Sequence, residues 1–124
     1  MASSPRSSSP ITEAEASVFA ALSDPTRRQL VQWLSEDGPA TATELARRLP
    51  ISRQAVAKHL AILQASGLVT PTKHGRDVRF RLQAEPLTGA MEWMAALAAR
   101  WDERLEALSR LLGSTGEQDD RRLR

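Results

Sequence analysis

Residues 41–82 have the sequence TATELARRLPISRQAVAKHLAILQASGLVTPTKHGRDVRFRL, and this stretch decides the fold. Thr41 and Glu44 have the three-residue spacing of a capping box, in which each side chain satisfies a backbone N–H at the start of a helix. A short first helix is therefore predicted after Thr41, and Pro50 is expected to close it.

A second helix is predicted immediately after this turn. Ser52 is placed to act as its N-cap, and the helix is expected to cover residues 53 to about 65. Gly67 can then adopt the left-handed backbone conformation that ends many helices. Two helices joined by a tight turn follow from these signals.

Two β-strands are predicted next, over residues 69–73 and 78–82, joined by a loop over residues 74–77. Alternation in the second strand places Val78, Phe80 and Leu82 on one face and Arg79 and Arg81 on the other. Helix, turn, helix and basic hairpin in this order predict a winged helix-turn-helix. The fold class is mainly α with a small β-hairpin, and the expected chemistry is binding to nucleic acid.

The distribution of charge supports nucleic-acid binding. The chain of 124 residues has a net charge of only +2, but residues 52–81 contain six basic residues and one acidic residue, a net charge of +5. A basic segment that coincides with the second helix and the hairpin is expected on a surface that faces phosphate. There is no cysteine, which excludes disulfides and thiolate metal sites. No apolar run is long enough to span a membrane, so a cytoplasmic protein is expected.

One domain is predicted over residues 11–112, with disordered polar tails at residues 1–10 and 113–124. Thr12 with Glu15 forms a second possible capping box, and Asp24 before Pro25 is a further helix start. The last helix is expected to begin at Glu85 and to run to about residue 112.

The last helix has a long apolar stripe of the coiled-coil type. Its apolar residues recur every three or four positions, which is more apolar surface than one small domain is expected to cover. A homodimer is therefore predicted, although the stripe would partly pack on the chain's own core. The predicted dimer interface consists of Met94, Leu97, Trp101, Leu105 and Leu108 of this helix with Val18, Phe19 and Leu22 of the first helix of the chain.

The second motif helix has a distinct outer face. At about 100° per residue, Val56, Leu60 and Leu63 point to the core, while Gln54 and Lys58 lie on the opposite side. A lone helix could present these two residues to solvent only, but the basic hairpin that follows favours DNA. The predicted DNA contacts are Ser52, Arg53, Gln54, Ala55, Lys58 and His59 in this helix and Lys73, His74, Arg76 and Arg79 in the hairpin. Packing is an alternative role for His59, and plain exposure in the turn is one for His74.

Four ordered motifs resemble the ArsR (ArsR/SmtB) family of bacterial repressors: LSDPTRRQL at 22–30, TELA at 43–46, ISRQAVAKHL at 51–60 and SGLV at 66–69. The resemblance implies a homodimeric repressor that binds a palindromic operator in double-stranded DNA. The helix over residues 52–66 would read the bases, and the wing over residues 69–82 would contact the DNA backbone. The family's metal sensors carry a cysteine cluster before the turn or histidine and acidic ligands on the last helix. This chain has neither, so no metal site and no cofactor are expected.

Two other functions remain open from the sequence. A winged-helix domain can also serve as a protein-interaction module, although such a wing need not be basic. A small-molecule effector could bind between subunits, in a pocket lined by Trp33, Trp93 and Trp101, although aromatic residues at helical spacing more often form core. No enzyme is expected, because no catalytic constellation or phosphate-binding loop stands out.

Overall fold

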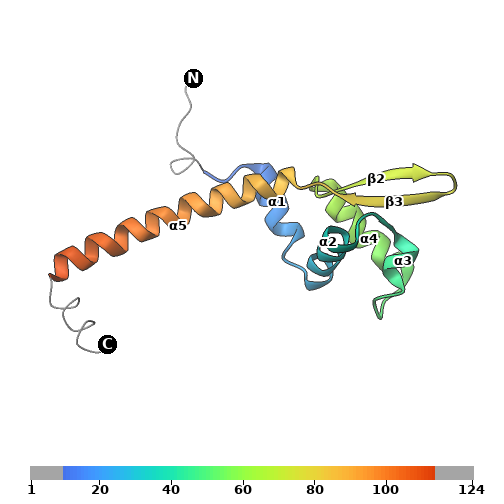
Figure 1. Cartoon of the computed structure of the whole chain (residues 1–124), viewed down its shortest axis with the longest axis horizontal. Coiled ribbons are helices and arrows are strands. Elements are labelled where there is room, and N and C mark those ends of the chain that lie inside the picture. Colours follow the sequence, from blue (N-terminus) through green and yellow to red (C-terminus); the bar gives the residue numbers. More distant parts are fainter. Residues whose placement is uncertain (1–9, 114–124) are drawn as a thin grey trace, which may run out of the picture. The chain divides into compact units, whose positions relative to one another are not determined.

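A computed structural model of the chain describes residues 10–113 (Figure 1). They divide into two compact units, residues 10–91 and the remainder of the last helix from Glu92 onward. The predicted tails fall almost wholly outside the described residues. The elements in chain order are α1 (Glu13–Ala21), α2 (Pro25–Asp37), β1 (Ala40–Thr41), α3 (Ala42–Ala46), α4 (Arg53–Ala65), β2 (Val69–His74), β3 (Asp77–Leu82) and α5 (Glu85–Leu112).

The predicted helix starts are confirmed. Both capping boxes form: the Thr12 hydroxyl accepts from the Glu15 N–H at 3.1 Å, and the Thr41 hydroxyl accepts from the Glu44 N–H at 3.0 Å. Asp24 caps α2, whose first residue is Pro25 as expected. Each cap satisfies backbone N–H groups that the first turn of a helix leaves without a partner.

The first motif helix is shorter than predicted. α3 ends at Ala46 rather than at Pro50, and residues 47–50 form a turn. In this turn the N–H groups of Arg48 and Leu49 donate to the carbonyls three residues back, at 3.1 and 3.3 Å. Because a residue before proline disfavours the helical conformation, the chain tightens before Pro50 instead of completing another α-helical turn.

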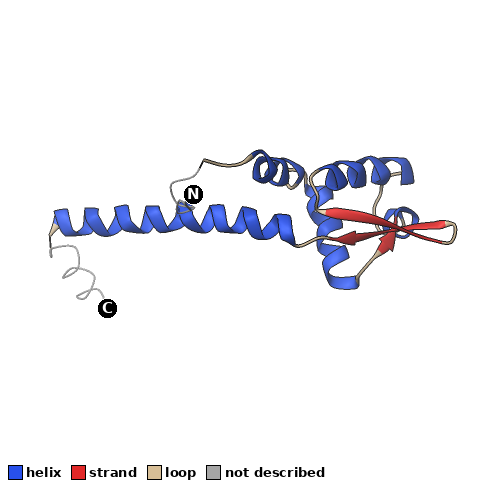
Figure 2. Ribbon diagram, turned by 90° about the horizontal axis from the view of Figure 1, so that it is seen from above, coloured by secondary structure: helices blue, strands red, loops and turns tan. Residues whose placement is uncertain are grey.

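The hairpin has a tighter turn than predicted, because each strand is one residue longer. His74 pairs with Asp77, so only Gly75 and Arg76 remain between the strands, and Gly75 has a left-handed φ of 62°. The two-residue strand β1, which was not predicted, pairs with β3 and completes a sheet of order β1-β3-β2. The tip of the hairpin projects beyond the neighbouring helices (Figure 2).

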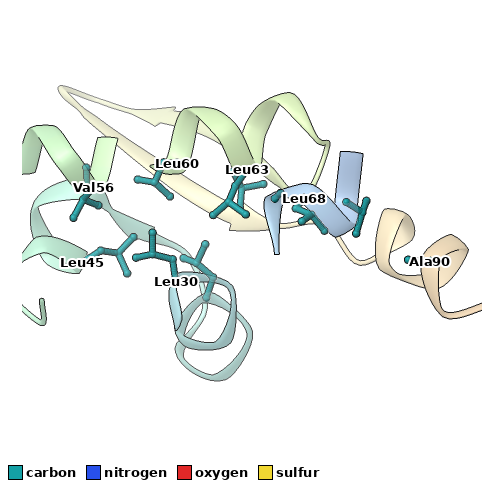
Figure 3. Packing of buried hydrophobic residues seen from close by; sticks show 12 residues of the cluster. Leu30, Leu45, Val56, Leu60, Leu63, Leu68 and Ala90 are labelled. Atoms are coloured by element: carbon teal, nitrogen blue, oxygen red, sulfur yellow. The ribbon is translucent and has the colours of Figure 1, made fainter. Parts of the chain in front are cut away.

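The core lies between α4 and the helices before it (Figure 3). The predicted inner stripe of α4 is confirmed, because Val56, Leu60 and Leu63 are completely buried. Leu68 is also fully buried, directly after Gly67, whose φ of 83° turns the chain out of α4. The inner stripe fixes which side of α4 faces outward, and this decides the geometry of the site.

One residue of the predicted dimer interface is wrongly placed. Val18 is only 1% exposed and belongs to the chain's own core, so it has no surface to offer to a partner. Phe19 and Leu22 are half-buried and pack against the same core. The period of a short helix identifies an apolar face, but it does not say which residues the domain itself covers.

The last helix has the bounds that the sequence predicts. Its first turns pack on the core through Leu87 and the buried Ala90. In the second unit, the predicted interface residues of α5 are 40–57% exposed: Met94, Leu97, Trp101, Leu105 and Leu108. Across residues 10–113 no helix is both long enough and apolar enough to traverse a bilayer.

Candidate nucleic-acid interface

α4 presents a polar and small-residue face on the side away from the core. Gln54 and Lys58 are exposed, as are Ala61 and Ala65 further along the same face. A helix that enters the major groove needs long polar side chains near its N-terminus and small residues where its backbone approaches the duplex. Ser52 caps this helix, since its hydroxyl accepts from the Ala55 N–H at 3.1 Å.

A cavity of about 540 Å³ opens between α3, the N-terminal half of α4 and the wing. Its lining includes three cationic side chains, from Arg47, Arg53 and Arg76. Arg53 is held in place by Thr43, whose hydroxyl accepts from the Arg53 Nε at 2.9 Å. This bond leaves the terminal guanidinium nitrogens of Arg53 available for an anion.

Glu44 and Asp77 add two carboxylates to the lining of this cavity. The Thr41 N–H that donates to Glu44, together with the positive charges of Arg79 and Arg47, holds the pKa of the Glu44 carboxyl below its usual value. The Glu44 carboxylate therefore offsets part of the charge of Arg79 and Arg47. Arg47 and Glu44 were not among the predicted site residues, although Glu44 belongs to the TELA motif at residues 43–46.

The wing places its basic residues on two different sides. Arg76, in the turn, lines the cavity beside Arg53. Arg79 and Arg81 instead border a second cavity of about 320 Å³, together with Thr72, His74 and Pro39. Of the predicted contacts in the wing, Lys73 and His74 are exposed and Arg79 is half-buried. The structure thus groups Arg76 with the residues of α4 and separates Arg79 from them.

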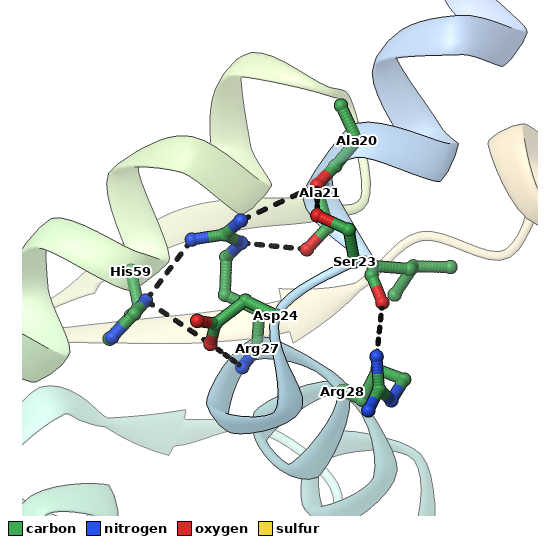
Figure 4. Close-up of polar contacts among 8 residues, drawn as sticks. Ala20, Ala21, Ser23, Asp24, Arg27, Arg28 and His59 are labelled. Atoms are coloured by element: carbon green, nitrogen blue, oxygen red, sulfur yellow. Dashed lines mark hydrogen bonds and ion pairs between the residues drawn. The ribbon is translucent and has the colours of Figure 1, made fainter.

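His59 lies on a flank of α4 and contacts the start of α2 (Figure 4). Its Nδ1 atom is 3.3 Å from Nη1 of Arg27 and 3.8 Å from Oδ2 of Asp24. The backbone N–H of Arg27 holds the pKa of the Asp24 carboxyl below its ordinary value, so this carboxyl stays ionised near neutral pH. The side chain of His59 keeps 23% of its surface exposed, so the structure accommodates both predicted roles, packing and DNA contact.

The match to known proteins begins directly after α1 and continues into the wing. Residues 22–72 match a family described as a helix-turn-helix domain. An ArsR-like transcriptional regulator from Rhodococcus sp. RHA1 has a structure similar to this one, with a TM-score of 0.70 and 45% sequence identity. The alignment covers 79% of this chain and 92% of that one. This chain belongs to the ArsR family of transcriptional regulators.

Two relatives support the same assignment. The HTH-type transcriptional regulator Rv2034 of Mycobacterium tuberculosis is 38% identical over 78% of this chain and 87% of its own length. The transcriptional repressor SdpR of Bacillus subtilis is 31% identical over 71% of this chain and 97% of its own length. As an ArsR-family member with a winged helix-turn-helix, the protein is a DNA-binding transcriptional regulator.

Two further features of this ArsR-family chain bear on ligands. Within the described range 10–113, no group of three His, Cys, Asp or Glu side chains is placed to hold a metal ion. Trp33, one of the three tryptophans considered for an effector pocket, is half-buried against the core, and the guanidinium of Arg48 lies 4.1 Å from the centroid of its ring. This contact favours packing over effector binding for Trp33.

Proposed function

We propose that this ArsR-family regulator is a homodimeric repressor that reads a palindromic operator with α4 and contacts the flanking backbone with the wing. The observation that carries the proposal is the orientation of α4. Its inner stripe is completely buried, so the exposed Gln54 and Lys58 necessarily face outward. An amide at this position can pair in bidentate fashion with adenine, and an ammonium can donate to guanine or to phosphate.

The cavity beside α4 fits the DNA strand that separates two neighbouring grooves. With α4 in the major groove and the wing near the adjacent minor groove, that strand would pass between them. The cavity lies in this position and is lined by the cationic Arg47, Arg53 and Arg76. Phosphate contacts of this kind set the register of a protein on the duplex without reading bases.

The exposed stripe of α5 supports the homodimer. In the second unit, large apolar residues recur at spacings of three and four and leave 40–57% of their surface open. A stripe of this length on a water-exposed helix indicates a partner surface, and a second copy of the chain supplies a matching stripe. Two copies would also supply the two reading helices, ~34 Å apart, that a palindromic operator needs.

Repression is proposed because the relative SdpR is named as a transcriptional repressor. A dimer bound across a promoter would block access by polymerase without any chemical step. We accordingly propose that the protein is not an enzyme and needs no metal or cofactor. It would act in the cytoplasm, where bacterial promoters are accessible.

Binding-site selection with the full chain tests this function. Random duplexes should yield an enriched site with two inverted half-sites about one helical turn apart, and sedimentation should show one dimer on each selected duplex. Failure to enrich any sequence would favour a protein-interaction module. Enrichment of a single half-site bound by one chain would refute the proposal that a homodimer binds two inverted half-sites.

A further inference from the structure

One guanidinium joins the reading helix to two other elements. Arg27 donates through Nε to the Ala21 carbonyl at 2.6 Å and through Nη2 to the Ala20 carbonyl at 3.4 Å, both at the C-terminal end of α1. Its remaining terminal nitrogen, Nη1, lies 3.3 Å from Nδ1 of His59 on α4 (Figure 4). The two carbonyl contacts fix the plane of the guanidinium, and with it the direction in which Nη1 points.

The chemistry of this contact determines the proton on His59. A guanidinium has only donor N–H groups and stays charged, so Nδ1 of His59 must be the acceptor. With Nδ1 as the acceptor, the ring N–H that remains is on Nε2. Oδ2 of Asp24 is 3.8 Å from the same Nδ1, which is within ion-pair range but longer than a hydrogen bond, and it accepts the Arg27 N–H at 3.0 Å.

We propose that Arg27 is a positioning residue that holds His59 as the Nε2–H tautomer, so that α4 presents this N–H to a backbone phosphate of the operator. The inference rests on the proposed function, since it needs α4 in the major groove. It assigns to Arg27, on α2, a role in DNA binding that it performs through another residue.

The position of His59 on α4 favours phosphate over a base edge. At about 100° per residue, His59 lies on a flank of the helix, one step around from Lys58 at the centre of the outer face. The outermost face of a helix in the major groove meets the bases, while its flanks pass the phosphate strands. Arg53 and Ala57 line the cavity toward the wing on one flank, and His59 lies on the other. The two flanks would therefore contact the two strands.

The tautomer can be measured without DNA. The chain contains two histidines, so His74→Gln leaves His59 as the single imidazole. Long-range ¹H–¹⁵N spectra of this full-length protein at neutral pH should show a neutral ring with Nε2 protonated. Adding Arg27→Met should convert the pattern to a mixture of tautomers or to the other one. A ring protonated at Nδ1, or at both nitrogens, in the parent protein would overturn the proposal even if the Arg27 variant failed to fold.

Arg28→Met is the matched control. Arg28 follows Arg27 in α2 and likewise donates to a carbonyl near the end of α1, from Nη1 to Leu22 at 2.8 Å, but no contact joins it to His59. The variant removes the same charge and a similar carbonyl contact. It should leave the imidazole spectrum unchanged. An equal spectral change in both variants would mean that Arg27 acts on His59 only through general stability.

The effect on DNA binding is measured with the duplex most enriched by selection with the wild-type chain. His59→Phe keeps the ring but removes the donor, so affinity should fall about threefold to tenfold for each half-site, as for one lost hydrogen bond. His59→Gln, which keeps an N–H donor, should recover most of the loss. The contacted phosphate is found by replacing the backbone phosphates of each half-site, one at a time, with an uncharged methylphosphonate. At one position this replacement should abolish the difference in affinity between wild type and His59→Phe. If no position does so, the proposed contact between His59 and phosphate is wrong.

Lys58→Ala distinguishes a failure of the proposed function from a failure of the Arg27–His59 inference. If Lys58→Ala weakens binding to the duplex while His59→Phe and Arg27→Met do not, the proposed function stands and this inference fails. If none of the three variants alters binding, the placement of α4 in the groove fails as well. Arg27→Met combined with His59→Phe should lose no more affinity than His59→Phe alone, because Arg27 acts on DNA only through the His59 N–H that His59→Phe already removes.

Discussion

Arg48 lies over the indole ring of Trp33, with its guanidinium carbon 4.1 Å from the ring centroid, and its Nη1 is 2.7 Å from Oδ2 of Asp37. Arg48 belongs to the turn between α3 and α4, whereas Trp33 and Asp37 belong to α2. One side chain thus ties the turn that orients the reading helix to the preceding helix, through a cation–π contact and an ion pair.

Replacing Arg48 should therefore cost stability. Arg48→Ala removes a cation–π contact worth roughly 0.5–1 kcal/mol and an exposed ion pair worth at most about 1 kcal/mol, so we expect a loss of about 1 kcal/mol in the free energy of unfolding. Urea unfolding of the full chain measures it. Arg47→Ala is the control, because Arg47 is exposed and should change stability by less than about 0.5 kcal/mol. Equal losses would show that neither the Trp33 contact nor the Asp37 ion pair contributes to stability.

Gln54 is expected to read a base. Gln54→Ala should relax the base preference at one position of each half-site by roughly 1–3 kcal/mol, because it removes a possible bidentate pair with adenine. Lys58→Ala should weaken binding more than it changes preference. Binding-site selection with each variant separates the two effects. An unchanged sequence logo and affinity for both variants would contradict the assignment of this face to the groove.

Arg76 is expected to contact phosphate more strongly than Arg79. Arg76 lines the cavity beside α4, while Arg79 lies on the other side of the hairpin and near the carboxylate of Glu44. Arg76→Ala should lower affinity for all sequences and reduce the slope of log affinity against log salt by about 1 for each lost contact. Arg79→Ala should reduce the slope less. Fluorescence anisotropy from low to moderate salt, with Arg28→Ala as a control, tests this order.

Metals should not regulate the protein. The chain has no cysteine, and α5 contains no histidine. We expect micromolar zinc, cadmium, nickel or arsenite to leave the affinity for the selected operator unchanged. Titration with and without each metal, after treatment with a chelator, provides the measurement. A tenfold shift in affinity, equivalent to about 1.4 kcal/mol of coupling, would reveal a site that the prediction excludes.

The stripe of α5 should hold the dimer together. Leu97→Asp with Trp101→Asp would place unpaired charges in an apolar interface, where each costs several kcal/mol, so the dimer should dissociate and operator binding should collapse. Ala95→Asp with Ala99→Asp is a matched control, with the same spacing on the opposite face of the same helix. Sedimentation of the wild type and the two double variants at micromolar concentration measures their oligomeric state. A monomeric wild type or a dimeric Leu97/Trp101 variant would refute the interface.

Much of the local structure follows from the sequence. The N-caps at Thr12, Asp24, Thr41 and Ser52 all form as predicted, and the last helix covers residues 85–112. These features depend on neighbours within about four positions, which the sequence shows directly. The buried stripe of α4 was equally predictable, because a helical period of 3.6 residues relates one side of the helix to the other.

Features that depend on distant parts of the chain were not predictable from local sequence. Strand β1 has only two residues and forms because β3 offers it an edge, some forty positions further along. Val18 has the pattern of a surface stripe, but the fold buries it. A pattern shows that a residue is apolar, whereas only packing decides whether the chain itself covers it.

By itself, the sequence determined the order of helices and strands, the outward face of α4 and membership of a DNA-binding class, because caps, glycine positions and apolar periods act over a few residues. Only the tertiary structure decided which charged groups meet. Arg27 contacts His59 across 32 positions of sequence, Arg53 joins Thr43 across the turn, and Arg76 rather than Arg79 lines the cavity beside α4. Such contacts depend on the directions of side chains from elements brought together by folding, and no local propensity encodes those directions.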